Sequence, residues 1–444
     1  MGISLMTVAA SLLAAMSCSG NEPSPEPTPS DTRSMTVQES VEIAHTGGEF
    51  AIEIESNFDI RVEPMTDWIE FDRVEGNKAW FTADPNGYTS NREGQVKFSD
   101  AKDRYYYKVS KVVQAGDPNP VTSLKIVDKN ATAETKALFA NLWAIAEKGS
   151  VDFGPIMDNR HTSGENEIRR RVIIEAYNRG EVITACCHLN NPHTGGDSWD
   201  NSSKDVVKSI LTEGHATRTK YLQWLDRCAD FANNLKGADG KLIPIIFRPY
   251  HEHTQTWSWW GSSCTTQDEF IRFWQFTVNY LRDTKGVRNF IYAISPQMDA
   301  DYGSEVKNRL LHRWPGDDYV DFLGMDCYHY SNANAFKSNL TAMTALSLEK
   351  KKPCGVTETG PEGFNWPDYW TNHILASAKN QRVSLIVMWR NKYVGSNEWD
   401  RHFYSVYPGH ESEEDFRKMY NDPTTFFSND LPDMYTMPRY YEVK

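Results

Sequence analysis

From residue 117 onwards, short apolar runs alternate with longer amphipathic stretches. Seven of the runs have the length and composition of strands: residues 151–157, 182–188, 242–247, 290–295, 320–325, 354–358 and 383–389. Helical periodicity fills most of the intervals, for example residues 219–235 and 267–282. Strands that are apolar throughout are buried on both faces, as in a parallel sheet covered by helices. The pattern therefore predicts a (β/α)8 TIM barrel over residues 117–444.

The charge of the chain argues against a nucleic-acid partner. The 444 residues carry a formal net charge of -13, whereas phosphate binding relies on clustered lysine and arginine. A neutral polymer suits this surface better. We also expect no metal and no cofactor, because the cysteines form no CxxC pair of the kind that binds zinc, and we expect a monomer.

The cysteines after the first eighteen residues have two expected states. Four of them lie in strand-like runs and are expected to be small buried hydrophobic residues, namely Cys186, Cys187, Cys327 and Cys354. One disulfide that involves Cys228 or Cys264 remains an alternative.

The N-terminal segment predicts a secreted, lipid-anchored protein. Its apolar stretch, residues 8–16, is too short to span a bilayer and is typical of a signal peptide. Residues 13–18, Leu-Ala-Ala-Met-Ser-Cys, resemble a bacterial lipobox, which implies lipidation of Cys18 and an anchor in the membrane. The alternative is ordinary cleavage that leaves a free N-terminal cysteine. Residues 19–34 are rich in proline, serine and acidic residues and predict an extended tether.

Residues 35–116 predict a small antiparallel β-sandwich. Alternating segments occur at residues 50–55, 79–83, 94–98 and 105–113, with glycine, asparagine and aspartate between them. The domain also contains the motifs Gly47-Gly48, Asp67-Trp68-Ile69, Asn91-Arg92-Glu93-Gly94 and Val112-Val-Gln-Ala-Gly116. With these motifs it resembles a BACON domain, an immunoglobulin-like module common beside carbohydrate enzymes in Bacteroidetes. Trp68 and Trp80 are core residues or a platform for a sugar; the core role and a spacer function are favoured.

Polar side chains gather where five of the predicted barrel strands end. They are His188 with Asn190 and Asn191, Arg248 to Glu252, Asp326 with Tyr328 and His329, Glu358, and Trp389 with Arg390 and Asn391. Chemistry in such barrels takes place at the carboxyl ends of the strands. We therefore expect these side chains to share one site.

Glu252 and Glu358 are the catalytic candidates within that site. Two carboxyl groups about 5–5.5 Å apart hydrolyse a glycosidic bond with retention, one as acid/base and one as nucleophile. The acid needs an environment that keeps it protonated, and the nucleophile needs donors that keep it charged. Glu252 lies among aromatic residues and suits the first role, whereas Glu358 suits the second. The alternative is that both are buried salt-bridge partners.

Four motifs stand at or near these strand ends: Phe247-Arg-Pro-Tyr-His-Glu252, Trp257-Ser-Trp-Trp-Gly261, Asp326-Cys-Tyr328 and Thr357-Glu-Thr-Gly360. With them, the chain between residue 120 and the low 400s resembles glycoside hydrolase family 26. It implies a retaining, metal-independent enzyme, in most members an endo-β-1,4-mannanase, with Glu252 as acid/base and Glu358 as nucleophile. It also implies a set of substrate-binding or positioning residues: His188, Trp199, His251, Trp257, Tyr328, Trp389 and Arg390.

Within that set, His251 and Tyr328 would position the nucleophile, and Arg390 would contact the next sugar on the non-reducing side. His188, Trp257 and Trp389 would line the subsite of the distorted ring.

Three neighbouring residues have simpler expected roles. Arg248 either braces the barrel mouth or takes part in the site. Asp326 is expected to orient its neighbours, and His253 is expected at the surface.

The predicted barrel is one strand short of the family pattern. In the family, a first strand, a long loop and a second strand precede the strand that carries the histidine, whereas here only residues 151–157 do so. Either residues 121–128 replace the first strand, or a segment has been lost. A surface glycan-binding protein without turnover is therefore kept as an alternative. Activity on β-glucan or β-1,3-xylan is kept as a second alternative, because one epimeric hydroxyl separates mannose from glucose and its recognition depends on loop geometry. For an enzyme that cuts large β-mannans, an outer-membrane site facing the medium suits better than the periplasm.

Overall fold

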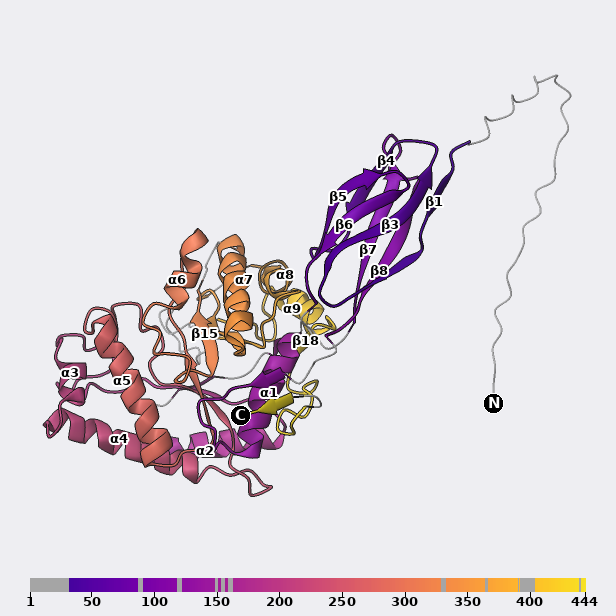
Figure 1. The fold of residues 1–444 in the computed structure, drawn as a ribbon. Helices are drawn as coiled ribbons and strands as arrows, with labels where there is room; N and C mark the ends of the chain where they lie inside the picture. The colour runs from indigo at the N-terminus through magenta and orange to yellow at the C-terminus, as the bar shows by residue number, and fades with distance from the viewer. Residues whose placement is uncertain are drawn as a thin grey trace, which may run out of the picture. The chain divides into compact units, whose positions relative to one another are not determined.

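The structure is a computed structural model in which two units can be described. It describes residues 32–86, 91–117, 122–147, 151–152, 156–158, 163–328, 333–363, 366–389, 391, 404–438 and 441–444. Residues up to 115 form one unit, and residues from 116 onwards form most of the other (Figure 1). Cys18 and the signal and tether segments up to residue 31 lie outside the described residues.

The first unit consists of two four-stranded sheets around one core. The first sheet has the order β1 (Met35–Val37), β3 (Gly48–Ser56), β6 (Lys78–Ala83) and β5 (Ile69–Glu75). The second has the order β2 (Ser40–Ile43), β8 (Tyr107–Gln114), β7 (Arg92–Asp100) and β4 (Ile60–Pro64). Ile52 and Phe81 of the first sheet and Phe98 and Val112 of the second are fully buried in the same cluster. The alternating pattern of these strands thus faces one shared interior.

Two details of this unit refine the expectations from sequence. Strand β2 runs parallel to β8, whereas an antiparallel sandwich was expected; the chain changes sheet between β1 and β2 within two residues, so it continues in the same direction on the other side. The indoles of Trp68 and Trp80 each carry an arginine over one face, Arg92 at 4.2 Å and Arg73 at 5.2 Å. This stacking favours a packing role for both tryptophans.

The second unit is built on a parallel sheet of nine strands. Their spatial order is β11-β12-β13-β14-β15-β16-β17-β10-β18, and every pairing is parallel. The strands are β10 (Val151–Asp152), β11 (Ile156–Asp158), β12 (Thr184–Cys186), β13 (Ile245–Arg248), β14 (Phe290–Ile294), β15 (Phe322–Asp326), β16 (Cys354–Thr359), β17 (Leu385–Met388) and β18 (Thr425–Phe426). Every residue of β13, β14, β15 and β16 is buried. The unit has a (β/α)8-like architecture.

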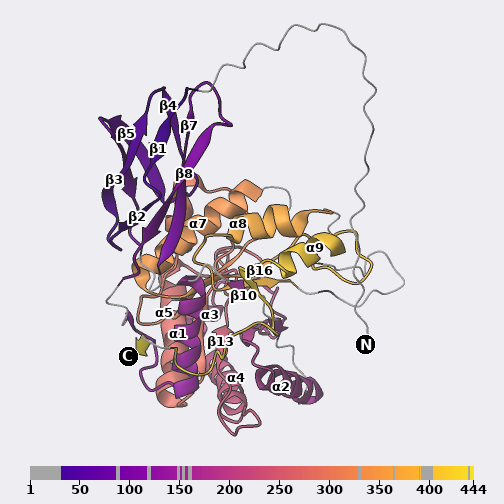
Figure 2. The same ribbon diagram turned by 90° about the vertical axis from the view of Figure 1, so that its right-hand side faces the viewer.

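Helices occupy the intervals between these strands. In Figure 2 the labels of strands β10, β13 and β16 lie in the middle of the second unit, and helices such as α1, α5 and α7 lie around them. The helices are α1 (Ala133–Glu147), α2 (Ser163–Asn178), α3 (Val206–Leu211), α4 (Ala216–Asn233), α5 (Gln267–Asn279), α6 (Val306–Leu310), α7 (Ala333–Lys350), α8 (Ala376–Ala378) and α9 (Glu413–Tyr420). A 3-10 turn covers Gly303–Glu305, and π-helical turns cover Tyr280–Thr284 and Trp370–Leu375. Helix α5 begins with a capping box, in which Thr266 and Glu269 each accept from the other's backbone N–H.

The count of seven barrel strands was wrong. The run at residues 151–157 contains two strands, because β10 pairs with β17 at one end of the sheet and β11 pairs with β12 at the other. Eight consecutive barrel positions are therefore occupied by strands, and what is short is the connection between the first two. In the described part of the chain no ladder joins β10 to β11. The dipeptide Gly154-Pro155 in this run was the available signal for a break.

Residues 121–128 do not replace a barrel strand. Strand β9 (Thr122–Leu124) pairs in parallel with β19 (Tyr441–Val443) in a separate two-stranded sheet. The cysteine expectation is also settled for the described residues, since none of their six cysteines, Cys228 and Cys264 among them, forms a disulfide. The described residues contain no helix that is both apolar and long enough to cross a bilayer.

Asp321, the residue before β15, ties strand β14 to the segment that precedes α1. Its fully buried carboxylate accepts hydrogen bonds from the backbone N–H of Val127 at 2.6 Å and of Tyr292 at 2.9 Å. Burial raises the pKa of Asp321 to about 6. The side chain thus joins β14 to the segment that precedes α1.

We expect Asp321→Ala to destabilise the second unit by about 2–4 kcal/mol, because the buried N–H of Tyr292 and the half-buried N–H of Val127 lose their acceptor. Asp318→Ala is the matched control: Asp318 is exposed and pairs with Lys125 at the surface, so its loss should cost at most about 1 kcal/mol. Denaturant unfolding of both variants measures the difference. Equal destabilisation would contradict the role given to Asp321.

Candidate active site

Four neighbouring strands deliver the polar side chains of the site. Arg248 is the last residue of β13, Ser295 directly follows β14, Asp326 ends β15, and Glu358 is the second-last residue of β16. The β15–β16 ladder changes register after Met325, and as a result Asp326 pairs with Glu358. Two acidic residues therefore lie side by side at the carboxyl end of the sheet.

Arg248 links these two acids. Its buried guanidinium donates from Nη1 to Asp326 Oδ2 at 2.7 Å and from Nη2 to Glu358 Oε1 at 2.5 Å. Burial alone lowers the pKa of Arg248, but the charges of Asp326 and Glu358 outweigh it and raise the pKa above its usual value. The permanent positive charge offsets the cost of burying two carboxylates. These contacts fit both alternatives for Arg248, because it joins the strand ends through charge-assisted hydrogen bonds and also binds Glu358.

Glu358 has a donor on each carboxylate oxygen. Arg248 binds Oε1, and the hydroxyl of Tyr328 donates to Oε2 at 2.7 Å. Burial, followed by the charge of Glu358, raises the pKa of Tyr328 well above its ordinary value, so the tyrosine keeps the proton that it donates. Hydrogen bonds of this kind favour the charged form of a carboxylate.

Glu252 has the opposite environment. It lies in the turn after β13 with a left-handed backbone, φ 49°, and its N–H donates to Ser295 O at 2.8 Å. Burial, followed by repulsion from Glu358, raises the pKa of Glu252 to about 8, and a hydrogen bond from Trp257 Nε1 at 2.6 Å opposes the shift. The carboxyl group is therefore mostly protonated at neutral pH.

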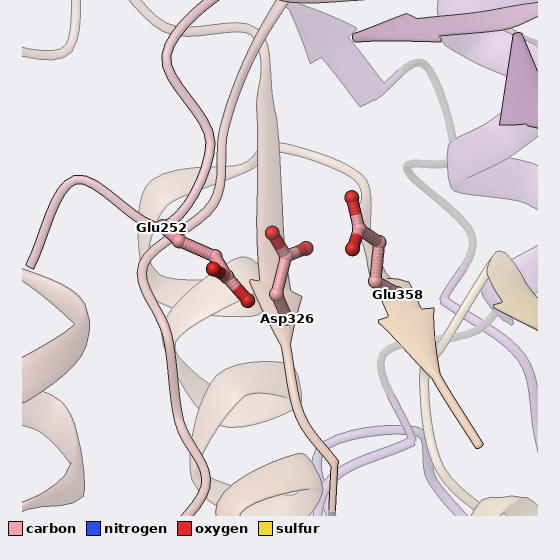
Figure 3. A group of neighbouring side chains, drawn as sticks. All are labelled: Glu252, Asp326 and Glu358. Atoms are coloured by element: carbon pink, nitrogen blue, oxygen red, sulfur yellow. The ribbon is translucent and has the colours of Figure 1, made fainter. Parts of the chain in front are cut away.

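The three carboxyl groups lie close together. One oxygen from each of Glu252, Asp326 and Glu358 lies within 4.8 Å of the others, and Figure 3 shows Asp326 between the two glutamates. Such a group is close enough to bind a cation, but two of the three carboxylates already hold Arg248. The arrangement is that of a protonated acid next to a charged, hydrogen-bonded carboxylate.

A cluster of aromatic rings lies beside Glu252. The Trp257 ring lies 4.4 Å from that of Trp199 and is stacked at 6.0 Å on His188, whose ring is 4.6 Å from His251. Trp199 is 53% exposed, so it presents an open ring face at the edge of the site. Burial and then the charge of Arg248 lower the pKa of His251 well below its usual value, which makes it neutral.

Most of the residues expected from sequence thus lie in one cluster. Glu252, Glu358, His188, His251, Trp257 and Tyr328 are joined by the contacts above, and Trp199 borders them. Trp389 directly follows β17, and its backbone N–H donates to Thr359 O at 2.8 Å. Arg390 lies outside the described residues.

The sequence reading missed the contribution of β14. Asp299, in the loop after this strand, accepts from the backbone N–H of Tyr328 at 2.7 Å and from Gln297 Nε2 at 2.7 Å. Its charge also contributes, less than Glu358 does, to the raised pKa of Glu252. Asp299 follows an apolar run, so the rule that selected the other strand ends would have selected it as well.

The surface position expected for His253 was wrong. Its side chain is fully buried and stacked at 4.4 Å on Phe270, and Arg313 donates to its backbone oxygen at 2.9 Å. Burial lowers its pKa well below the usual value. The chain turns inward after Glu252, so a residue beyond the motif is still part of the interior.

Comparisons of this chain with known proteins all indicate the same protein family. The family model of Glycosyl hydrolase family 26 matches residues 161–410. The chain is 27% identical over 359 residues to a mannan endo-1,4-beta-mannosidase of Bifidobacterium adolescentis, a match over 66% of this chain and 34% of that protein. It is 25% identical over 245 residues to the enzyme of the same name from Bacillus subtilis strain 168, over 53% of this chain and 61% of that protein. The matches thus span about a third and about three fifths of these relatives.

Solved structures give the same result. A GH26 beta-mannanase from Bacteroides ovatus superposes with a TM-score of 0.63 at 33% identity, over 69% of this chain and 98% of that one. The catalytic domain of a GH26 endo-beta-1,4-mannanase from Bacillus sp. JAMB-750 gives a TM-score of 0.65 at 26% identity, over 73% and 98% of the two chains.

The electrostatic environment of Glu252 predicts opposite effects of two substitutions. Glu358→Gln removes a negative charge and should lower the pKa of Glu252 from about 8, whereas Trp257→Phe removes the opposing hydrogen bond and should raise it. Carbon-13 NMR titration of the glutamate carboxyl groups measures both shifts. Glu349→Gln, at an exposed surface pair with Lys307, should change nothing. Shifts of the same sign in the first two variants would contradict this account.

Proposed function

Because the chain belongs to glycosyl hydrolase family 26, we propose that it is a retaining endo-β-1,4-mannanase. Its substrates are the internal β-mannosidic bonds of mannan, galactomannan or glucomannan. The observation that carries the proposal is the contrast between two adjacent glutamates: Glu252 has a pKa raised to about 8, and Glu358 is held by Arg248 and Tyr328. The mannan endo-1,4-beta-mannosidases among the relatives support the choice of substrate.

In the first step, Glu358 attacks the anomeric carbon and Glu252 protonates the departing glycosidic oxygen. The bond to the leaving sugar breaks as the ester to Glu358 forms. The short separation, with oxygens within 4.8 Å, favours this retaining route, because inversion needs carboxyl groups about 6.5–9.5 Å apart to admit a water.

In the second step, Glu252 takes a proton from water, which attacks the anomeric carbon and releases Glu358. The ester carries no negative charge, so the repulsion that raised the pKa of Glu252 is absent in the intermediate. The hydrogen bond from Trp257 then favours the carboxylate form of Glu252. The same residue is thereby suited to act first as acid and then as base, and the reaction uses no metal or cofactor.

The surrounding residues bind and position the sugar. In this proposal His188, Trp257 and Trp389 line the subsite of the distorted mannosyl ring, and Trp199 offers a platform at its edge. Arg390 contacts the next sugar on the non-reducing side. His251 and Tyr328 position the nucleophile, the latter through its bond to Oε2.

The proposal predicts distinct losses for the two glutamates. Glu358→Ala should abolish the release of oligosaccharides from mannan and glucomannan. Glu252→Ala should reduce it by about 10²–10⁴-fold, with a much smaller loss on an aryl mannobioside whose leaving group needs no proton. Glu349→Ala, at the surface, should match the unsubstituted protein.

Reducing-sugar assays on a panel of mannan, glucomannan, mixed-linkage β-glucan and β-1,3-xylan provide the measurement. If the protein hydrolyses only the glucan or only the xylan, that polymer and not mannan is the substrate. Binding of these polymers without any product would replace the enzyme by a glycan-binding protein.

We further propose that the protein is a monomeric outer-membrane lipoprotein that faces the medium. The lipobox-like residues before Cys18 support the anchor. The first unit, as a BACON-like immunoglobulin sandwich, would act as a spacer between membrane and enzyme. The stacking of arginines on Trp68 and Trp80 supports a spacer over a sugar platform.

Cys18→Ala should therefore stop the incorporation of a labelled fatty acid and move the protein from the membrane fraction to the soluble fraction. Cys228→Ala, in α4, should stay in the membrane fraction, because its thiol lies outside the lipobox. Protease treatment of intact cells tests the orientation. A Cys18→Ala protein that keeps its label and its membrane location would refute the anchor.

A further inference from the structure

A polar cavity lies beside the turn that carries Glu252. Its volume is about 110 Å³, and its lining residues are Thr254, Gln297, Tyr302, Arg309 and His312. Thr254 is two residues beyond Glu252, and its hydroxyl accepts from the backbone N–H of Gln297 at 3.0 Å. The other lining residues belong to the segment between β14 and β15. The cavity is therefore continuous with the loops that form the site.

The side chains of this cavity offer both donors and acceptors. Arg309 lies 4.7 Å over the ring of Tyr302, and within the described parts of the chain its guanidinium has no carboxylate partner. Gln297 donates from Nε2 to Asp299, which leaves its amide oxygen to accept. Burial and then the charges of Arg313 and Arg309 lower the pKa of His312, so its ring is neutral. Donors and acceptors without a carboxylate match the hydroxyl groups of a neutral sugar.

The position of the cavity indicates which sugar it binds. Residues after β17, with Arg390 among them, are proposed above for the non-reducing side of the scissile bond. Strands β14, β15 and β16 lie between β13 and β17 in the sheet order. The cavity follows β13 and β14 and thus lies across the barrel from β17. It is next to Glu252, the residue that protonates the leaving group.

We propose that this cavity is a subsite for a sugar unit on the leaving-group side of the scissile bond, in which Arg309 and Gln297 bind sugar hydroxyls. The inference rests on the proposed glycosidase function and adds to it a determinant of how the polymer is placed. Arg309 is exposed and stacks on Tyr302, and among the described residues its side chain makes no ion pair or hydrogen bond, so it can be changed without removing a buried polar contact.

Two substrates separate this role from a structural one. Mannohexaose places sugar units on both sides of the scissile bond, whereas an aryl mannobioside places only the aryl group on the leaving side. Arg309→Ala should lower kcat/KM for mannohexaose by about tenfold, the worth of a hydrogen bond from a charged donor. It should leave kcat/KM for the aryl mannobioside within about twofold. Arg309→Lys should lose less, since a charged donor remains.

Arg272→Ala is the matched control, because Arg272 is an exposed arginine on α5 whose ion pair among the described residues is with Asp268, also at the surface. Unchanged kinetics of Arg309→Ala on both substrates would overturn the subsite, and so would an equal loss on both. If the unsubstituted protein hydrolyses neither substrate, the proposed function itself fails. An active protein with an unaffected Arg309→Ala variant refutes the subsite alone.

Discussion

The site depends on the buried guanidinium of Arg248. It joins the ends of β13, β15 and β16 by binding Asp326 and Glu358 at once. Without a cation, two carboxylates at this depth would repel each other, and the hydrogen bonds from Thr357 to Asp326 and from Tyr328 to Glu358 would not cancel that repulsion. The planar, rigid guanidinium group also fixes the directions of the two hydrogen bonds, and a lysine could not bind both partners in the same way. The orientation of Glu358, and with it the separation from Glu252, follows from this bridge.

Beside Arg248, the two glutamates Glu252 and Glu358 lie in different environments. Arg248 and the hydroxyl of Tyr328 donate hydrogen bonds to Glu358. Glu252 is buried, accepts a hydrogen bond from Trp257 and is repelled by the charge of Glu358. The protonation of Glu252 therefore depends on the charge of Glu358. Asp299 adds to the same field from β14 while it fixes the backbone at Tyr328. The acid, its neighbour and the loop that supports them form one electrostatic unit.

The barrel and the main site residues could be predicted because the ends of the apolar strands can be recognised in the sequence. Parallel strands converge at one edge, so the polar residues that follow apolar runs, such as Glu252 and Tyr328, had to be near each other. The register change after Met325, which pairs Asp326 with Glu358, leaves no local signal, and so the partners of Arg248 could not be chosen. The burial of His253 depends on the path of a turn. The division of residues 151–157 was readable from Gly154-Pro155, but an apolar run of seven residues looks like a single strand.

The left-handed backbone of Glu252 has a consequence for engineering. A residue with a side chain in this conformation costs about 1–2 kcal/mol relative to glycine, which adopts it freely. A search for stabilising substitutions would therefore select position 252 for glycine or asparagine. Either change would ease the turn and remove the carboxyl group of Glu252. Screens for thermostability in this chain need an activity filter, because the fold alone favours the loss of the acid.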